Sequence, residues 1–313
     1  MTTSTTRLFS KPLLYIDPAA EDDHAALDLA TSFSNAQSEP LTIVTVVPKP
    51  EWKLLGHSGR AAEVLQGVTE HAREKLESVA SAARTRGARV ETRLLEGNPH
   101  VELIGAAVAG QHGLGAKTMA GSLENARTAY GSMARKLLRS CPGAVLLAHP
   151  QLNKIDRVVL ALGCENTADG PTDICIRTAQ AAREWADFAG APLEVVHAWH
   201  PYGEWIVGKR FPSTDPFEYA QAEKLAAETH LSETLSHLPV EIPSDHVHLK
   251  EGKPETVIPE YASNAAGDLL VLGSVARSGI KGMLLGNTAE NILERVNCSV
   301  LVVKPADFVS PIQ

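Results

Sequence analysis

One stretch near the end of the chain decides the fold, and it reads Leu269-Leu-Val-Leu-Gly273-Ser-Val-Ala-Arg-Ser-Gly-Ile-Lys-Gly-Met-Leu-Leu-Gly286-Asn-Thr-Ala-Glu290. The apolar run before Gly273 predicts a short buried strand. A glycine-rich loop follows, and a helix is expected to begin near Thr288. Glycine allows close approach of a ligand to the backbone, and a helix N-terminus offers free N–H groups with a positive dipole. The loop is not a Walker A motif, because no Gly-Lys-Ser/Thr follows its glycines.

The pattern occurs twice in the chain, with a constant displacement of 155 residues. The run Glu96-Gly97-Asn98-Pro99 aligns with Glu251-Gly252-Lys253-Pro254, and Gly131 aligns with Gly286. The other aligned pairs are Ala134 with Ala289, Leu138 with Leu293, Val145-Leu146 with Val300-Leu301, and Pro150 with Pro305. Because about 150 residues is an ordinary domain size, the repeat predicts two copies of one domain, at 1–152 and 153–313, joined by the polar segment 151–156. The period is too long for a solenoid or a propeller.

Each half alternates short apolar runs with longer helical stretches. Strands are predicted at 13–16, 41–47, 89–95, 114–119 and 144–148, and again at 157–162, 193–198, 246–249, 268–272 and 299–303. Helices are predicted at 25–34, 61–86, 101–109 and 132–139, and again at 172–189, 219–238, 256–262 and 288–295. Almost wholly apolar strands that alternate with helices predict an α/β fold, in which a parallel sheet is covered on both faces. Right-handed crossovers make each copy doubly wound.

The composition excludes several classes of protein. The chain has 313 residues, 44% of them hydrophobic, which suffices for two ordinary cores. Its formal net charge of -8 argues against partners such as nucleic acid or an anionic membrane. Its first residues have no apolar core of a signal peptide, and no apolar run is long enough for a transmembrane helix. We therefore expect a cytoplasmic protein. The spacing of Cys141, Cys164, Cys175 and Cys298 suits buried small hydrophobes better than a metal site.

The segment 268–305 resembles the universal stress proteins almost throughout. Nucleotide-binding members of that family carry Gly-x2-Gly-x9-Gly-Ser/Thr at this strand–loop–helix and an aspartate at the end of the first strand. The tandem layout, with Tyr15-Ile16-Asp17-Pro18 in the first half, is similar to the E subgroup. The resemblance implies two five-stranded parallel sheets with strand order 3-2-1-4-5, a fold like that of the adenine nucleotide alpha hydrolases. It also implies that the repeats pair through their last strands as a pseudo-dimer, and that the protein acts in the stress response.

The second repeat departs from the family motif. Its loop reads Gly273-x2-Ala276-x9-Gly286-Asn287, so alanine replaces the second glycine and asparagine replaces the Ser/Thr. Gly163 stands where the family has the first-strand aspartate. Asn287 can still donate from its amide, and the helix N-terminus retains its backbone N–H groups.

The first repeat keeps more of the motif. It reads Thr118-x2-Gly121-x9-Gly131-Ser132, so that only the first glycine is lost, and the aspartate is present as Asp17. If ATP binds in the family manner, the resemblance implies that it binds here. The residues implied for the adenosine are Asp17 and Val46, those for the phosphates are Gly121, Gly131 and Ser132, and the second-repeat counterparts are Gly273, Gly286 and Asn287.

Simpler interpretations compete with these roles. Gly131 and Gly286 could serve only close packing at a helix start, and Asp17 could simply cap the next element. Glu96-Gly97 and Glu251-Gly252 are better explained as strand-to-helix turns than as catalytic acids.

The second repeat contains further candidates. His246 and His248, two apart on one predicted strand, lack an evident third metal ligand, so the sequence predicts no metal site. Trp199, Tyr202 and Trp205 could line an apolar pocket, although core or interface packing is the stronger interpretation.

Two functions remain open. No nucleophile–base series and no supported pair of carboxylates is evident, so the first hypothesis is a stress-response protein without catalytic activity. It would bind a small-molecule ligand, apolar or anionic, or a protein partner, and two chains would pair further as a homodimer. The second hypothesis is a nucleotide sensor or slow ATPase that binds ATP in the first repeat. Direct DNA binding is disfavoured by the acidic balance.

Overall fold

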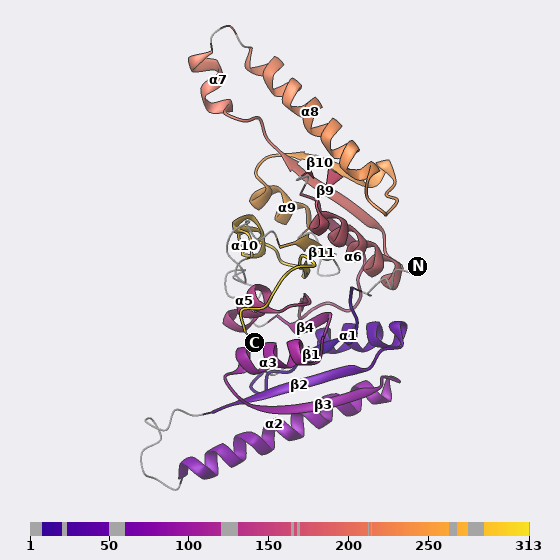
Figure 1. Cartoon of the computed structure of the whole chain (residues 1–313), viewed down its shortest axis with the longest axis vertical. Coiled ribbons are helices and arrows are strands. Elements are labelled where there is room, and N and C mark those ends of the chain that lie inside the picture. The colour runs from indigo at the N-terminus through magenta and orange to yellow at the C-terminus, as the bar shows by residue number, and fades with distance from the viewer. Residues whose placement is uncertain are drawn as a thin grey trace.

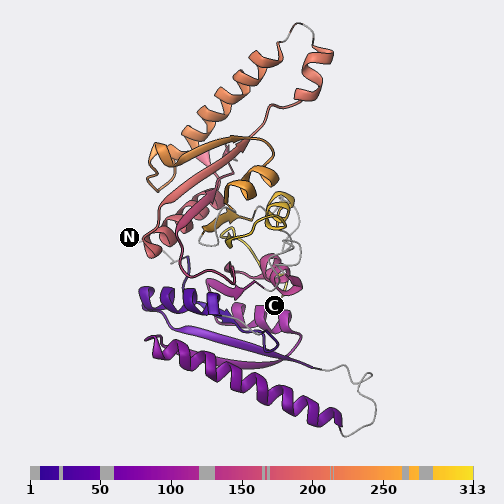
Figure 2. The same ribbon diagram turned by 180° about the vertical axis from the view of Figure 1, so that it is seen from behind.

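The structure is a computed structural model that describes residues 8–20, 24–49, 60–119, 131–163, 166–167, 170–211, 213, 215–262, 268–274 and 285–312. Figures 1 and 2 show an elongated molecule in which one sheet runs through both halves of the chain, with a long helix reaching outward at each end. Within the described residues, no helix combines the length and the apolar character needed to cross a membrane.

The first half forms the elements that its apolar pattern predicts. Its strands are β1 (Leu13–Tyr15), β2 (Leu41–Pro48), β3 (Val90–Gly97), β4 (Leu114–Thr118) and β5 (Ala144–Ala148). Its helices are α1 (His24–Gln37), α2 (Arg60–Thr85), α3 (Pro99–Ala109) and α5 (Gly131–Ser140). The strand β5 is buried along its whole length, as expected for a strand covered on both faces.

The second half repeats this order and adds elements that the sequence did not predict. Its strands are β6 (Arg157–Ala161), β7 (Asn166–Thr167), β8 (Gly170–Pro171), β9 (Leu193–Trp199), β10 (Val247–Glu251), β11 (Asp268–Gly273) and β12 (Ser299–Val303). Its helices are α6 (Asp173–Ala189), α7 (Glu204–Arg210), α8 (Pro216–Ser236), the short 3-10 helix η1 (Ser244–His246), α9 (Pro254–Ala262) and α10 (Asn287–Leu293). The additions are α7, η1 and the small β7–β8 pair. Because η1 ends at His246, this residue does not share a strand with His248.

The strand order confirms the doubly wound topology in both repeats. The sheet runs β10-β9-β6-β11-β12-β5-β4-β1-β2-β3, which is 3-2-1-4-5 within each half. The two predicted sheets are in fact one ten-stranded sheet, because the last strands β5 and β12 pair antiparallel. Leu146 lies opposite Leu301 in this pairing, and the two are separated by the repeat length of 155 residues. The pseudo-twofold axis of the pseudo-dimer therefore passes through this pair.

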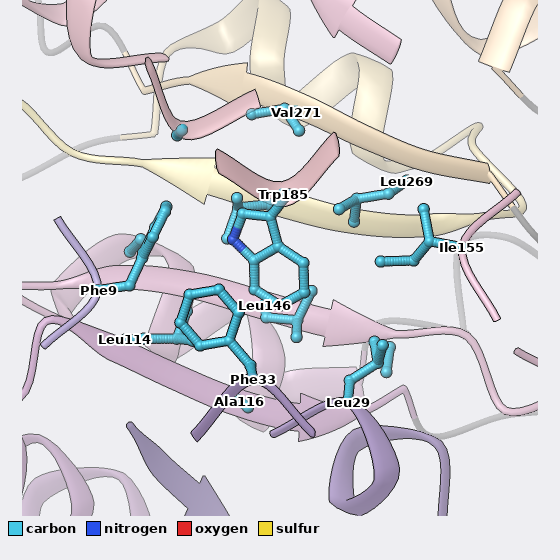
Figure 3. Packing of buried hydrophobic residues seen from close by; sticks show 14 of the residues in the cluster. Phe9, Leu29, Phe33, Leu114, Ala116, Leu146, Ile155, Trp185, Leu269 and Val271 are labelled. Carbon is cyan, nitrogen blue, oxygen red and sulfur yellow. The ribbon is translucent and has the colours of Figure 1, made fainter. Parts of the chain in front are cut away.

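Each face of the sheet has its own core, and each core extends through both repeats. Side chains from α1, α2, α6 and α8 cover one face. Side chains from α3, α5, α9 and α10 cover the other. On the first face, the ring of Trp185 stacks on that of Phe33 at a centroid distance of 4.7 Å, and Phe9 packs edge-on against both (Figure 3). This aromatic cluster joins α1 of the first repeat to α6 of the second.

Candidate functional site

The first repeat has a crevice of about 770 Å³ beyond the carboxyl ends of its strands. Ligands of doubly wound sheets bind at this edge. Four segments form the crevice: the ends of β1 and β2 with the loop after β1, the first half of α2, the turn into α3, and the first turns of α5. The lining residues are Tyr15, Asp17, Pro18, Ala19, Val46, Pro48, Val64, Gly67, Val68, His71, Asn98, Pro99, His100, Ser132, Met133 and Lys136.

The outer wall of the first crevice is one face of α2. Val64, Gly67, Val68 and His71 follow the three- and four-residue spacing that brings side chains to the same side of a helix. Both valines are exposed, so the wall presents uncovered apolar surface. A Cβ added at Gly67 would meet no atom within 4 Å, which leaves open space in front of this part of the wall.

A lysine fixes α2 to the loop after β1 at this place. Lys75 Nζ donates to the backbone carbonyl of Asp17 at 2.8 Å and also to that of Ala20. The Asp17 carboxylate is used locally, because its Oδ1 accepts the backbone N–H of Ala19 at 3.0 Å. The capping interpretation of Asp17 therefore holds for one carboxylate oxygen, while the residue still lines the crevice.

The inner end of the first crevice carries basic side chains. Burial and the nearby charge of Lys136 lower the pKa of His100. His100 Nδ1 lies 2.7 Å from Asn98 Oδ1, which orients the ring. Ser132 is exposed one residue after Gly131, which begins α5 with a φ of 49°. The charge of Lys136 and the hydroxyl of Ser132 in the same crevice favour the binding of an anion.

The structure brings most of the predicted first-repeat residues together. Asp17, Val46 and Ser132 line the same crevice, and Gly131 directly precedes Ser132. The positive φ of Gly131 favours glycine for conformational reasons, whatever its role toward a ligand. Gly121 lies outside the described residues.

The second repeat has a smaller crevice of about 300 Å³ at the equivalent place. Gly163, Gly273, Gly286 and Asn287 are among its lining residues. Its wall is largely apolar, with Ile174, Cys175, Ile258, Leu272 and Ile292 among the lining residues.

The geometry of two lining residues favours a packing role. A Cβ added at Gly273 would lie 2.8 Å from Thr178 Oγ1 and 2.9 Å from Ile174 Cγ1, so glycine is required for the approach of α6. His197 Nδ1 lies 2.8 Å from the carbonyl oxygen of Leu162, and burial lowers its pKa. The second crevice is therefore less suited to an anion than the first.

Several remaining candidates have structural explanations. Gly97 and Gly252 adopt φ values of 150° and 134°, and a Cβ at either would contact a side chain in the next helix, which confirms their turn role. Cys141, Cys175 and Cys298 are buried free thiols, as predicted, and Cys164 lies outside the described residues. Among the side chains that the structure describes, no three His, Cys, Asp or Glu residues could hold a metal ion.

Sequence reasoning missed the α2 wall and the basic pair His100 and Lys136. The valines and Gly67 occur in a helix rich in polar residues, and their spacing shows a common face but not what that face covers. The three aromatic residues near the end of β9 do not form a pocket, because Trp199 is buried whereas Tyr202 and Trp205 are exposed.

Comparisons with known proteins agree with this architecture. The sequence profile described as "Universal stress protein family" matches residues 171–304. The chain is 24% identical over 310 residues to universal stress protein E of Photorhabdus laumondii, covering 96% of each. It is 46% identical over 65 residues to a universal stress protein E homolog of Haemophilus influenzae, covering 21% of each. A crystal structure of a universal stress protein from Archaeoglobus fulgidus superposes with a TM-score of 0.63 at 20% identity, covering 96% of this chain and 98% of that one.

The repeated 3-2-1-4-5 sheet, the profile match over residues 171–304 and the similarity along the whole chain agree on one class of protein: the chain is similar to the universal stress proteins. It is a tandem protein similar to universal stress protein E.

Proposed function

We propose that this chain is a stress-response protein without catalytic activity, and that it acts by binding a small molecule in the first-repeat crevice. The observation that carries the proposal is the convergence of Asp17, Val46 and Ser132 on one cavity of about 770 Å³. The equivalent cavity of the second repeat is about 300 Å³. Under this proposal the two repeats have diverged in function, and the boundary between them falls at 152–153, after β5.

The lining of the first crevice supports a ligand with an apolar body and an anionic group. Val64 and Val68 offer exposed apolar surface, and Lys136 and Ser132 offer a positive charge and a hydroxyl. A bound anion would relieve the repulsion by Lys136 that helps to lower the pKa of His100. Ligand sites of this kind combine an apolar wall with a few polar groups that fix orientation.

The described lining favours binding over catalysis. Phosphoryl transfer requires ligands for Mg²⁺ and a group that positions the attacking nucleophile. Among the described lining residues, Asp17 is the one carboxylate, and its Oδ1 already accepts the N–H of Ala19.

ATP is the second candidate ligand, in a nucleotide sensor or slow ATPase. Its support is the position of Asp17 and Val46 near the strand ends and of Ser132 at the start of α5, in the arrangement that the family resemblance implies for adenosine and phosphates. In this case Gly121 and Gly131 would also contact the nucleotide in the first repeat. A nucleotide in the second repeat would contact the equivalent residues Gly273, Gly286 and Asn287.

The thermal midpoint of the purified protein with and without Mg-ATP tests this candidate. A ligand at 100 times its Kd that binds only the folded state stabilises it by about 2.7 kcal/mol. Gly131→Asp is the matched variant, because aspartate tolerates a positive φ and adds a negative charge where the phosphates would lie. A midpoint increase that Gly131→Asp abolishes supports ATP. If Mg-ATP does not raise the thermal midpoint of the wild type, ATP is excluded as the ligand, and the proposal is then another anionic ligand.

A further inference from the structure

In the second repeat, two helices form an arm at the edge of the sheet. Helices α7 and α8 lie between β9 and β10, and Figures 1 and 2 show them projecting beyond the edge of the sheet. The arm is fixed internally: Tyr219 Oη donates to the carbonyl oxygen of Tyr202 at 2.7 Å, and the Asp215 carboxylate caps α8 by accepting the N–H of Phe217 at 2.8 Å. Val207 of α7 is buried. The arm is therefore an ordered helical hairpin of α7 and α8, with a defined surface.

The tip of this arm exposes four aromatic side chains. The exposed fractions are 84% for Tyr202, 75% for Trp205, 53% for Phe211 and 70% for Phe217. Contiguous exposed apolar surface marks interaction sites, and aromatic residues are enriched at the centres of protein interfaces. We call these four residues the aromatic tip.

The helix beneath the aromatic tip lacks a core of its own. All of α8 is described, and its buried residues are Leu231 and Thr234, both near its end. From Pro216 to His230 no residue is buried, and the i,i+4 ion pair in this part joins Lys224 to Glu228 at 3.7 Å. Because helices in proteins gain most of their stability from tertiary packing, this half of α8 lacks the surface that would normally cover it.

The charges of the arm indicate what covers it. The segment 202–236 contains six acidic and three basic residues, so its formal net charge is 3 - 6 = -3. This balance is unfavourable for nucleic acid and for anionic lipid. The signs are separated: Lys209 and Arg210 end α7, whereas Glu218 and Glu228 lie along α8. A twofold axis would place the basic end of one arm against the acidic helix of the other, twice in the same interface.

We propose that the aromatic tip and the first half of α8 are a docking surface for a second copy of this chain, which binds through its own arm about a twofold axis. Between 202 and 225, 15 described residues are exposed and 5 are half-buried, which gives 20 that a partner could contact, at the lower end of the roughly 20–30 per side of an ordinary stable interface. The Trp, Tyr and Phe side chains form the buried centre, and the charges of α7 and α8 set the register.

Sedimentation equilibrium across the micromolar range tests this surface. The wild type is expected to reach twice the chain mass of 33.4 kDa. Trp205→Ala combined with Phe217→Ala is expected to raise the dimer Kd roughly thirtyfold or more, as loss of central aromatic anchors does. Val309→Ala is the matched control, an exposed apolar residue outside the arm, and it leaves the Kd unchanged.

A charge exchange makes the test independent of folding defects. Lys209→Glu with Arg210→Glu gives one variant, and Glu218→Lys with Glu228→Lys gives the other. Each alone is expected to remain monomeric, and their equimolar mixture is expected to form the heterodimer, because both contacts become attractive again. A monomeric wild type, dimers that survive the aromatic double substitution, a mixture that fails to associate, or binding of the monomer to phosphatidylglycerol vesicles through the tip would each overturn the proposal.

Discussion

Phe33 in α1 and Phe188 in α6 are 155 residues apart, and their rings meet edge to face with centroids 5.2 Å apart. They occupy the same position in the two repeats, so a residue of the repeat meets its own counterpart across the pseudo-twofold axis. Trp185 fills the remaining space and contacts both rings. Together with the Leu146–Leu301 pair in the sheet, this contact makes the two repeats one packing unit.

Trp185→Ala should therefore destabilise the whole chain. Trp185 is fully buried, and its removal leaves a large cavity between α1 and α6. Replacement of a buried aromatic residue by alanine lowers the free energy of unfolding by about 3–5 kcal/mol. Urea unfolding measures the change. Val309→Ala, at an exposed position, should stay within about 0.5 kcal/mol of the wild type. Similar values for the two variants would show that the aromatic cluster does not join the repeats.

Arg157 should be needed mainly because Asp268 is buried. Its Nη2 lies 2.5 Å from Asp268 Oδ2, and its Nη1 lies 2.9 Å from Glu194 Oε2. The side chain of Asp268 is only 4% exposed. Arg157→Met leaves that carboxylate without a cation, which costs about 3–5 kcal/mol, whereas a well-packed apolar pair costs far less.

The corresponding measurement is a double-substitution cycle in guanidinium chloride with Arg157→Met, Asp268→Leu and both together. The double variant should be more stable than Arg157→Met alone. A simple sum of the two single losses would mean that the pair is not coupled.

Lys304 should make stability increase at alkaline pH. It follows β12, it is buried, and its Nζ donates to the carbonyl oxygen of Leu138 in the other repeat. Burial lowers the pKa of Lys304 from 10.5 to about 8. Between these values the unfolded chain binds more protons than the native one, so the free energy of unfolding rises with pH, by about 3 kcal/mol in total.

Unfolding curves recorded at several pH values between about 8 and 10.5 would show this rise in the wild type, and its loss in Lys304→Met. Equal pH slopes in the two proteins would assign the effect to other groups. Cys141, buried nearby, acts on the pKa of Lys304 in the opposite direction from burial.

The sequence was sufficient to predict the tandem topology. Buried strands such as β5 and β12 read as continuous apolar runs, and the conserved spacing from Glu96 to Pro150 reappears after Glu251. The grouping of Asp17, Val46 and Ser132 in one crevice agrees with what the family resemblance implies for these residues.

Other features could not be read from the sequence, because they depend on where a helix points. In the sequence, the spacing of the α2 valines indicates only that they share one face of a helix. The structure shows that this face lines an open crevice. Likewise, Trp205 and Tyr202 are aromatic residues, which the sequence would place in a hydrophobic core. In the structure both are exposed on the arm. By contrast, the pairing of β5 with β12 that joins the two sheets into one was expected from the family resemblance.

Native mass spectrometry of the wild type, Gly67→Leu and Gly105→Leu tests the central claim most directly, that the first crevice is the ligand site. A Cβ at either glycine meets no atom within 4 Å, but Gly67 lines the crevice and Gly105 does not. Leucine also stabilises a helix relative to glycine by up to about 1 kcal/mol, so neither variant should unfold. We predict a small-molecule adduct on the wild type and on Gly105→Leu that is lost in Gly67→Leu. The same masses for the wild type and Gly67→Leu would contradict the claim.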